Sequence, residues 1–226
     1  WGWTAAVAVC GFLLALAAGI TIGTMRTLGM ASRKGASGWI HGLHSHHVGM
    51  VFAVTWTELF RNVPLLVQVF LWYHVLPYFV PALKAMPAWL LASAALGLFT
   101  SARIAEQVRA ALQALPRGQV QAAQALGMDT LQVYRLVLLP VALRQMIPTL
   151  TSEAMNAVKN SSVAFAVGIA ELTQFALQAQ EETAHGIEIY LAVTLLYAVT
   201  ALAVNRVLTL VEARVRVPGA FVAEAG

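Results

Sequence analysis

The chain has 226 residues, of which 59% are hydrophobic and 11% are charged, and its mean hydropathy is +0.73. An ordinary soluble domain carries about 25% charged residues, so the composition excludes that class, and the high hydrophobicity excludes an intrinsically disordered chain. The formal net charge is +4, a weak hint of anionic partners. We therefore expect a membrane protein, in which the positions of the basic residues matter more than their sum.

Five membrane-spanning helices are expected, because a helix needs about 20 mainly apolar residues to cross the bilayer. Residues 1–25 carry no charge, and the length of this run favours a membrane anchor over the shorter apolar core of a cleaved signal peptide. Residues 137–160 mix apolar with polar residues, which favours a span that faces protein or a polar cavity. Taken in chain order within a single domain of residues 1–226, the expected spans are about 4–25, 62–81, 85–103, 138–160 and 187–209.

The basic residues predict the orientation of these spans, because cytoplasmic loops carry an excess of Lys and Arg. With the N-terminus outside and the C-terminus inside, all of the 14 basic residues except Lys84 and Lys159 lie on the inner side. This count includes Arg61, at the expected start of the second span. The acidic residues before the fifth span then lie in an outer loop: Glu171, Glu181, Glu182 and Glu188.

The polar stretch between the third and fourth spans carries the most informative motif. Pro116-Arg117-Gly118 breaks the helix that leaves the membrane. The sequence then reads Gln121-Ala122-Ala123, three residues, Gly127, nine residues and Val137-Leu138-Leu139-Pro140. This spacing predicts two short helices around a glycine turn, the first over about residues 119–126. Pro140 is expected to begin the next membrane helix, where its missing N–H does little harm.

This pattern resembles the EAA loop of type I ABC importer permeases, which reads Glu-Ala-Ala, three residues, Gly, nine residues, Ile, any residue, Leu-Pro. The chain departs from it at Gln121, where Glu is usual, and at Val137, where Ile is usual. The resemblance covers about residues 50–218 and is closest to glutamate/aspartate importer permeases. Four further segments look like polar amino-acid permeases: residues 58–68, 102–109, 115–119 and 159–162.

The resemblance implies an all-α integral membrane fold with a cytoplasmic helix-turn-helix coupling loop over about residues 116–140. It implies an ATP-binding cassette ATPase dimer, a second, similar permease subunit that makes a heterodimer, and a periplasmic amino-acid-binding protein as partners in the bacterial inner membrane. The chain has no G-x-x-x-x-G-K-S/T loop, so we expect it to bind no cofactor and ATP and Mg²⁺ to bind the ATPase. The residues expected to couple the two proteins are Gln121, Ala122, Ala123, Gly127, Leu139 and Pro140.

A translocation path should be lined by polar groups that lipid does not tolerate. In the fourth span Thr149, Glu153, Asn156 and Asn160 recur on one helical face. Lys159 lies one step round and could offer its ammonium to a substrate carboxylate; the alternatives are that it snorkels to the outer interface or pairs with Glu153 or another subunit. The candidate path residues are Gln68, Ser101, Glu153, Asn156, Lys159 and Asn160.

Several of the polar and aromatic residues have structural alternatives. Gln68 could connect helices instead of contacting substrate. Arg103 and Glu106, three residues apart on a helix, are expected to pair with each other rather than bind substrate. The large aromatic residues expected to anchor the chain at the lipid interface are Trp56, Trp72, Tyr73 and Trp89.

A histidine-rich segment invites a metal site, but no Cys, Asp or Glu lies between Arg33 and Glu58 to complete one. We therefore expect no metal and interpret the segment as a solvated or interfacial loop. Its histidines are His41, His44, His46 and His47.

The expected function is that of a permease subunit, not an enzyme, in an ATP-driven importer that moves amino acids, glutamate or aspartate, into the cytoplasm. A self-contained secondary carrier or channel would transport without an ATPase, and the missing internal repeat and the loop motif argue against it. A membrane enzyme would need a nucleophile–base pair or a metal cluster, and neither occurs at plausible spacing. No nucleic-acid partner is expected.

Overall fold

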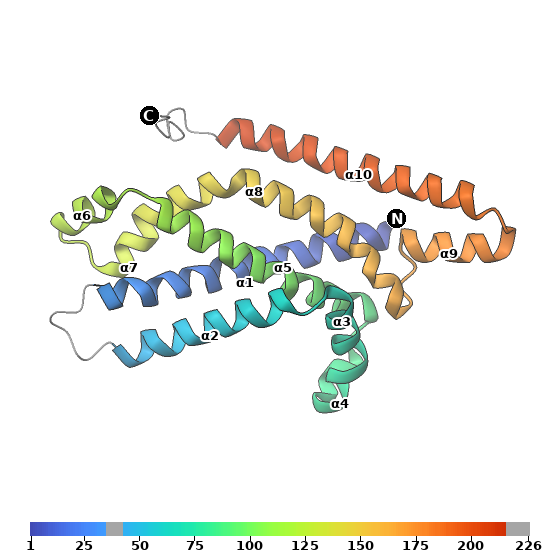
Figure 1. Ribbon diagram of the computed structural model, residues 1–226, viewed down its shortest axis with the longest axis horizontal. Helices are drawn as coiled ribbons and strands as arrows, with labels where there is room; N and C mark the ends of the chain where they lie inside the picture. Colours follow the sequence, from blue (N-terminus) through green and yellow to red (C-terminus); the bar gives the residue numbers. More distant parts are fainter. Residues whose placement is uncertain (35–42, 216–226) are drawn as a thin grey trace.

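The computed structural model describes residues 1–34 and 43–215, with the side chains of residues 1–28 and 48–214. All regular structure in these residues is helical. Five long helices run side by side (Figure 1): α1 (Gly2–Lys34), α2 (Leu43–Asn62), α5 (Ala88–Ala114), α8 (Leu139–Asn160) and α10 (Gly186–Val215). The shorter elements are α3 (Leu65–Phe70), η1 (Leu71–Val75), α4 (Leu76–Phe79), η2 (Pro81–Ala85), α6 (Arg117–Ala125), α7 (Thr130–Gln132), η3 (Val133–Leu138), η4 (Ser161–Val167) and α9 (Leu172–Thr183).

Among the described residues, four helical runs are long and apolar enough to cross a membrane, and a bent pair of helices makes a possible fifth. Four runs qualify alone: Gly2–Leu28, Ala88–Ala114, Thr130–Val167 and Gly186–Arg214. A fifth qualifies only as the bent pair Val48–Asn62 and Leu65–Phe79. The predicted all-α membrane fold is confirmed at this level.

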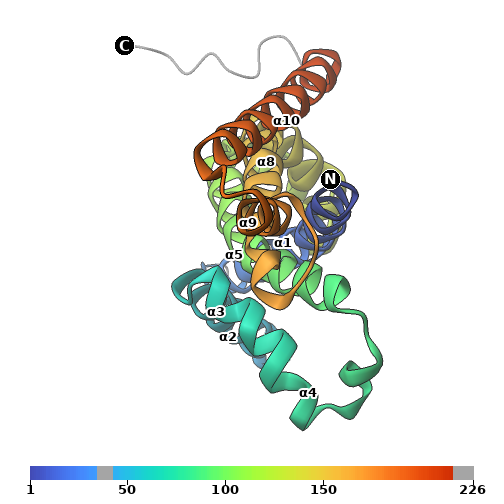
Figure 2. The ribbon, with the colours of Figure 1, turned by 90° about the vertical axis from the view of Figure 1, so that its right-hand side faces the viewer.

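The second expected span differs from the structure. Instead of one helix over 62–81, α2 ends at Asn62 and the next helical segment leaves at 106° to it. Pro64 explains the break, because proline has no N–H to donate and disfavours helical backbone at Val63 before it. The limb formed by α3 and α4 projects from the bundle on the side opposite α10 (Figure 2).

The bend also moves Arg61. Its expected place was the inner start of a span, beside the end of α1. It lies instead in the last turn of α2, at the end of that helix away from the C-terminal end of α1 (Figure 1). Hydropathy missed α2 because this helix includes Glu58, Arg61 and several histidines.

One end of the bundle gathers most of the connections between spans. Figure 1 shows the C-terminal ends of α1, α5 and α10 there, together with the start of α2 and the α6–α7 turn. The N-terminus and α9 lie at the other end. The expected orientation of the chain in the membrane stays a prediction.

α1 and α5 pack closely because small residues line their contact. Gly11, Ala15, Gly19 and Gly23 recur every four residues on α1, and all four are buried. A Cβ added to Gly23 would lie 2.6 Å from the carbonyl oxygen of Ala105. Small residues at this spacing let helix backbones approach each other within a membrane.

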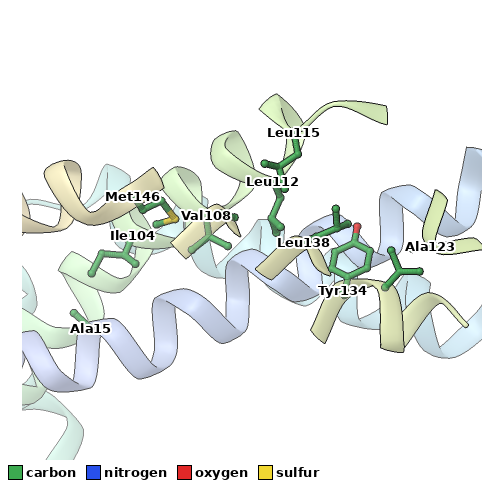
Figure 3. Packing of buried hydrophobic residues seen from close by; sticks show 11 residues of the cluster. Ala15, Ile104, Val108, Leu112, Leu115, Ala123, Tyr134, Leu138 and Met146 are labelled. Carbon is green, nitrogen blue, oxygen red and sulfur yellow. The ribbon is translucent and has the colours of Figure 1, made fainter. Parts of the chain in front are cut away.

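A buried hydrophobic cluster connects these spans with the α6–α7 turn (Figure 3). It includes Ala15 of α1 and Ile104 of α5, deep in the bundle, and Ala123 of α6 at its end. The polar turn is therefore packed onto the bundle rather than suspended from it. The remaining buried members are Val108, Leu112, Leu115, Val133, Tyr134, Leu138, Ala142 and Met146.

Pro140 lies in the first turn of α8, as expected for the start of that helix. α8 nevertheless continues a helical run that starts at Thr130 and passes through the π-helical turn η3. A π turn shifts the hydrogen bonds from the i−4 to the i−5 carbonyl, and η3 ends at Leu138, two residues before the proline, whose ring would clash within a regular helix. α5 likewise runs past the expected end at 103 and stops before Pro116.

Candidate functional site

The main polar contact between α5 and α8 is a buried carboxylate held by a guanidinium. Glu153 Oε1 accepts hydrogen bonds from Arg103 Nη2 at 3.0 Å, Arg103 Nε at 3.2 Å and Gln107 Nε2 at 2.9 Å. Glu153 is 3% exposed, whereas the Arg103 side chain is 41% exposed. A carboxylate this deeply buried needs a paired countercharge, so Arg103 stabilises it and keeps part of its guanidinium open.

The expected pair between Arg103 and Glu106 is therefore wrong. Glu106 faces α1 and accepts from Arg26 Nη1 at 2.6 Å, and it also pairs with Arg109 on its own helix. Packing decided the outcome, because α8 and α1 each offer a partner of opposite charge from a different side of α5. Glu153 is likewise paired with Arg103 rather than with Lys159.

Ser101 and Gln68 are both buried and bonded within the protein. Ser101 Oγ donates to the carbonyl of Leu98 and accepts from Trp56 Nε1 at 3.1 Å. Trp56 is thus bonded inside the bundle, and the other three expected anchors, Trp72, Tyr73 and Trp89, are partly buried against a hydrophobic cluster. The interfacial role of these four aromatic residues stays a prediction.

The amide of Gln68 supports the break between α2 and α3. Its Nε2 donates at 2.9 Å to the carbonyls of Phe60 and Val63, groups that the bend leaves without helical partners. A carbonyl without a hydrogen bond costs several kcal/mol inside a membrane. Gln68 therefore has a structural role, because it connects α3 to the end of α2. Its contribution to a path stays a prediction.

The polar residues in the C-terminal half of α8 differ in their exposure. Glu153 points into the bundle, Asn156 and Asn160 are partly exposed, and Lys159 is exposed. The Lys159 side chain lines a hollow of about 260 Å³ between the end of α8, α9 and α10. The other residues of this hollow are Ser162, Thr173, Ala176, Tyr190, Val193, Thr194 and Tyr197.

Glu171 is fully buried, although the sequence placed it in an acidic outer loop. Its Oε1 accepts from the backbone N–H of Gln174 and caps α9, and its Oε2 accepts from the Tyr197 hydroxyl at 2.6 Å. The backbone N–H of Leu172 donates to Thr4 Oγ1 at 3.2 Å. This network fixes α9 against both α1 and α10.

The turn between α6 and α7 has a compact, locally encoded geometry. Gly127 adopts a φ of +79°, its N–H donates to the Gln124 carbonyl, and the N–H of Met128 donates to the Ala123 carbonyl. These two bonds form a Schellman motif, in which glycine is favoured. Asp129 then starts α7 through a capping box with Gln132.

The residues expected to couple a partner divide between surface and core. Gln121, Ala122, Gly127 and Pro140 are exposed, Leu139 is partly buried, and Ala123 is buried in the cluster of Figure 3. One side of the turn is therefore exposed, and its other side packs against the spans.

The expectation for the histidine segment falls outside the described side chains. His41 lies outside the described residues, and the side chains of His44, His46 and His47 are not described. Among the residues whose side chains the structure describes, no group of three or more His, Cys, Asp or Glu could hold a metal ion.

Three hydrogen-bonded pairs of polar side chains were not predicted from the sequence. Arg26 and Glu106 are 80 residues apart, and Glu153 is 46 residues from Gln107. Tyr197 and Glu171 lie on different helices. A charge in an apolar stretch indicates that a partner exists, but no local pattern in the sequence shows which residue that partner is.

Known proteins match the chain over most of its length. The glutamate/aspartate import permease protein GltJ of Escherichia coli is 40% identical over 226 residues, which cover 96% of this chain and 85% of that protein. The glutamine transport system permease protein GlnP of Escherichia coli is 33% identical over 208 residues, covering 91% and 88%.

Solved structures agree with the fold described above. A chain of an amino acid ABC transporter crystallised with histidines superimposes with a TM-score of 0.73 at 30% identity, covering 94% of this chain and 89% of that one. A chain of the MetNI methionine ABC transporter gives a TM-score of 0.76 at 19% identity and supports the fold alone. Residues 35–217 match the family described as binding-protein-dependent transport system inner membrane component. The chain belongs to this family of inner-membrane transport components.

Proposed function

We propose that this chain is the membrane-spanning permease subunit of an ATP-driven ABC importer that moves amino acids, glutamate and aspartate in particular, into the cytoplasm. The observation that carries the proposal is the 40% identity to a glutamate/aspartate import permease over 96% of the chain. The chain itself is a transport subunit rather than an enzyme, and ATP hydrolysis belongs to a separate subunit.

The α6–α7 turn is the proposed contact with the ATPase dimer. It lies at the end of the bundle that gathers the connections, with α6 carrying exposed Gln121 and Ala122. Leu126, Leu131 and Leu136 are also exposed at this end. Since the inner side of the turn belongs to the same buried cluster as α1, α5 and α8, a displacement of the turn would move the spans as one body.

The same arrangement supports an orientation with this end in the cytoplasm and the N-terminus outside. Arg117 and Arg135 flank the turn, and Arg206 and Arg214 lie in the second half of α10. Basic residues concentrate on the cytoplasmic side. An amino-acid-binding protein would then dock at the α9 end, and a second, similar permease chain would complete the path as a heterodimer.

The proposed path runs along the polar side of α8. Arg103, held by Glu153, offers part of its guanidinium on this side. Asn156 and Asn160 continue the polar face toward Lys159. Ser101 and Gln68, bonded as described, support the helices around it.

Transport by the reconstituted assembly tests this function. The chain, its ATPase, its permease partner and the binding protein are placed in liposomes, and uptake of labelled glutamate is measured with and without ATP. We expect uptake only with both ATP and the ATPase. Uptake that survives removal of the ATPase would indicate a self-contained carrier, and ATP-dependent uptake of other amino acids alone would exclude the acidic substrate.

Gly127→Pro tests the coupling turn. Proline cannot adopt a φ near +79° and would lose the N–H bond to the Gln124 carbonyl, so the turn must change shape. We expect ATP-driven uptake to fall at least about tenfold, the effect of about 1.4 kcal/mol on a rate, with the protein still inserted and assembled. Gly118→Ala is the control, because no atom lies within 4 Å of an added Cβ there. Equal uptake by the two variants would contradict the assignment of the turn.

A further inference from the structure

The hollow beside Lys159 has the features of a binding site. It lies where α8, α9 and α10 meet, toward the end of the bundle that holds the N-terminus. A second hollow of about 440 Å³ adjoins it and shares Tyr190 and Thr194 as lining residues. All the residues that line this second hollow lie on α10, from Gly186 at its start to Thr194, so it is a shallow depression on the face of that helix beside the first hollow.

Two hydroxyls in the hollow are free to bind a ligand. Most Ser and Thr side chains in the described helices donate to a carbonyl three or four residues back, as Thr200 and Thr209 do on α10. This is the usual behaviour of a hydroxyl in apolar surroundings. Ser162 and Thr194 make no such bond among the described residues, so their hydroxyls are available inside the hollow.

Lys159 supplies a positive charge without a protein countercharge. Within the part of the chain whose side chains are described, no carboxylate lies within 4.0 Å of its ammonium, because Glu153 is taken by Arg103 and Glu171 by Tyr197. An ionisable group in a spanning segment usually pairs or faces a polar cavity. An anion that enters the hollow would provide the missing partner.

We propose that this hollow binds the carboxylate of an acidic amino acid in transit, through the Lys159 ammonium with hydrogen bonds from Ser162 and Thr194. This inference rests on the proposed function and assigns one of its sites. Ala176 and Val193 give the hollow an apolar wall, which suits the short hydrocarbon part of such a ligand.

Uptake kinetics of Lys159 variants provide the first test, in the complete reconstituted transporter. Lys159→Met should raise the KM for glutamate about tenfold or more, because a charge-assisted hydrogen bond is lost. Lys159→Arg should recover most of this loss, since it restores the charge. The matched control is Lys84→Met: Lys84 lies in a different hollow, 5.7 Å from the Tyr78 ring centroid, and its removal should leave KM unchanged.

The outcomes separate the site from the function. If the wild-type assembly does not import glutamate, the proposed function fails. If it does, and Lys159→Met matches Lys84→Met in KM, the proposed site is wrong. A rise in KM that Lys159→Arg does not reduce would also overturn it, because that result indicates a packing role instead of a charge.

Chemical labelling identifies the ligand directly. Lys34, Lys84 and Lys159 are the lysines of the sequence, so mass spectrometry can follow each after treatment of the assembly with an amine-acylating reagent. Glutamate should protect Lys159 at least severalfold and leave Lys84 unprotected. Protection by inorganic phosphate, or by phosphatidylglycerol vesicles compared with neutral ones, in place of glutamate would assign the site to a free phosphate or a lipid headgroup and overturn the carboxylate proposal.

Discussion

Arg103→Met should lower the free energy of unfolding by about 3–5 kcal/mol, the loss seen when one partner of a buried ion pair is removed. The reason is the carboxylate left behind. Glu153 is 3% exposed, and without Arg103 the only donor left to it among the described side chains is Gln107 Nε2. Unfolding by sodium dodecyl sulfate titration in bicelles, followed by circular dichroism, measures the change.

The exposure of the two partners predicts that the opposite substitution is milder. Glu153→Gln leaves Arg103, whose side chain is 41% exposed and can be hydrated. We expect a smaller loss for it, and the double variant Arg103→Met with Glu153→Gln should recover part of the stability that Arg103→Met loses. The double-mutant cycle then isolates the coupling between the two side chains.

A surface pair provides the control. Arg61 and Glu58 lie 3.1 Å apart with side chains 45% and 44% exposed, and exposed pairs contribute about 0–1 kcal/mol. Arg61→Met should therefore change the stability little. If Arg103→Met and Arg61→Met behaved alike, the pair between α5 and α8 would not be a buried one.

Local signals predicted four of the five spans and the glycine turn, because each of these is decided by neighbouring residues. A membrane requires every backbone polar group to be bonded inside its own helix or barrel, so apolar length alone identifies α1, α5 and α10. Gly127 and Asp129 mark the α6–α7 turn in the same way, through a left-handed residue and a helix cap.

Long-range partners could not be predicted, because they depend on which helix faces which. Glu106 has Arg103 and Arg109 within three residues and yet is also bonded to Arg26 from α1. Charge counting also placed Arg61 at the start of a span. It did not identify α2 as a helix, because the polar residues of α2 lower its mean hydropathy. The break at Pro64 could be read from the sequence, but the amide of Gln68 that satisfies it could not.

The contact between α1 and α5 was also hidden, although its residues follow a regular spacing. On α5, Ser93, Gly97, Ser101 and Ala105 recur every four residues opposite the small residues of α1. Hydropathy sums do not register such a pattern, because glycine and alanine differ little from their neighbours in the sum. Close packing, rather than hydrophobicity, drives helix association in lipid.

Gly23→Leu should consequently destabilise the protein, by about 1–3 kcal/mol as for other overpacked sites. An added Cβ would lie 2.6 Å from both the Ala105 carbonyl oxygen and Val108 Cβ. Neither is the flexible end of a side chain, so the helices themselves must separate. Combining it with Gly19→Leu, whose Cβ would lie 2.7 Å from Ile104 Cβ, should increase the loss, measured by the same titration.

The sign of this effect distinguishes packing from helix propensity. Replacing glycine within a helix by a better helix former favours folding by up to about 1 kcal/mol, so a net loss must come from the contact with α5. Gly2→Leu on the same helix serves as the control, since no atom lies within 4 Å of an added Cβ there. Stabilisation by Gly23→Leu would mean that α1 and α5 do not approach each other along this line of small residues. Separation of the two helices would also pull Arg26 from Glu106, so the Gly23 variant should weaken this ion pair without changing either charge.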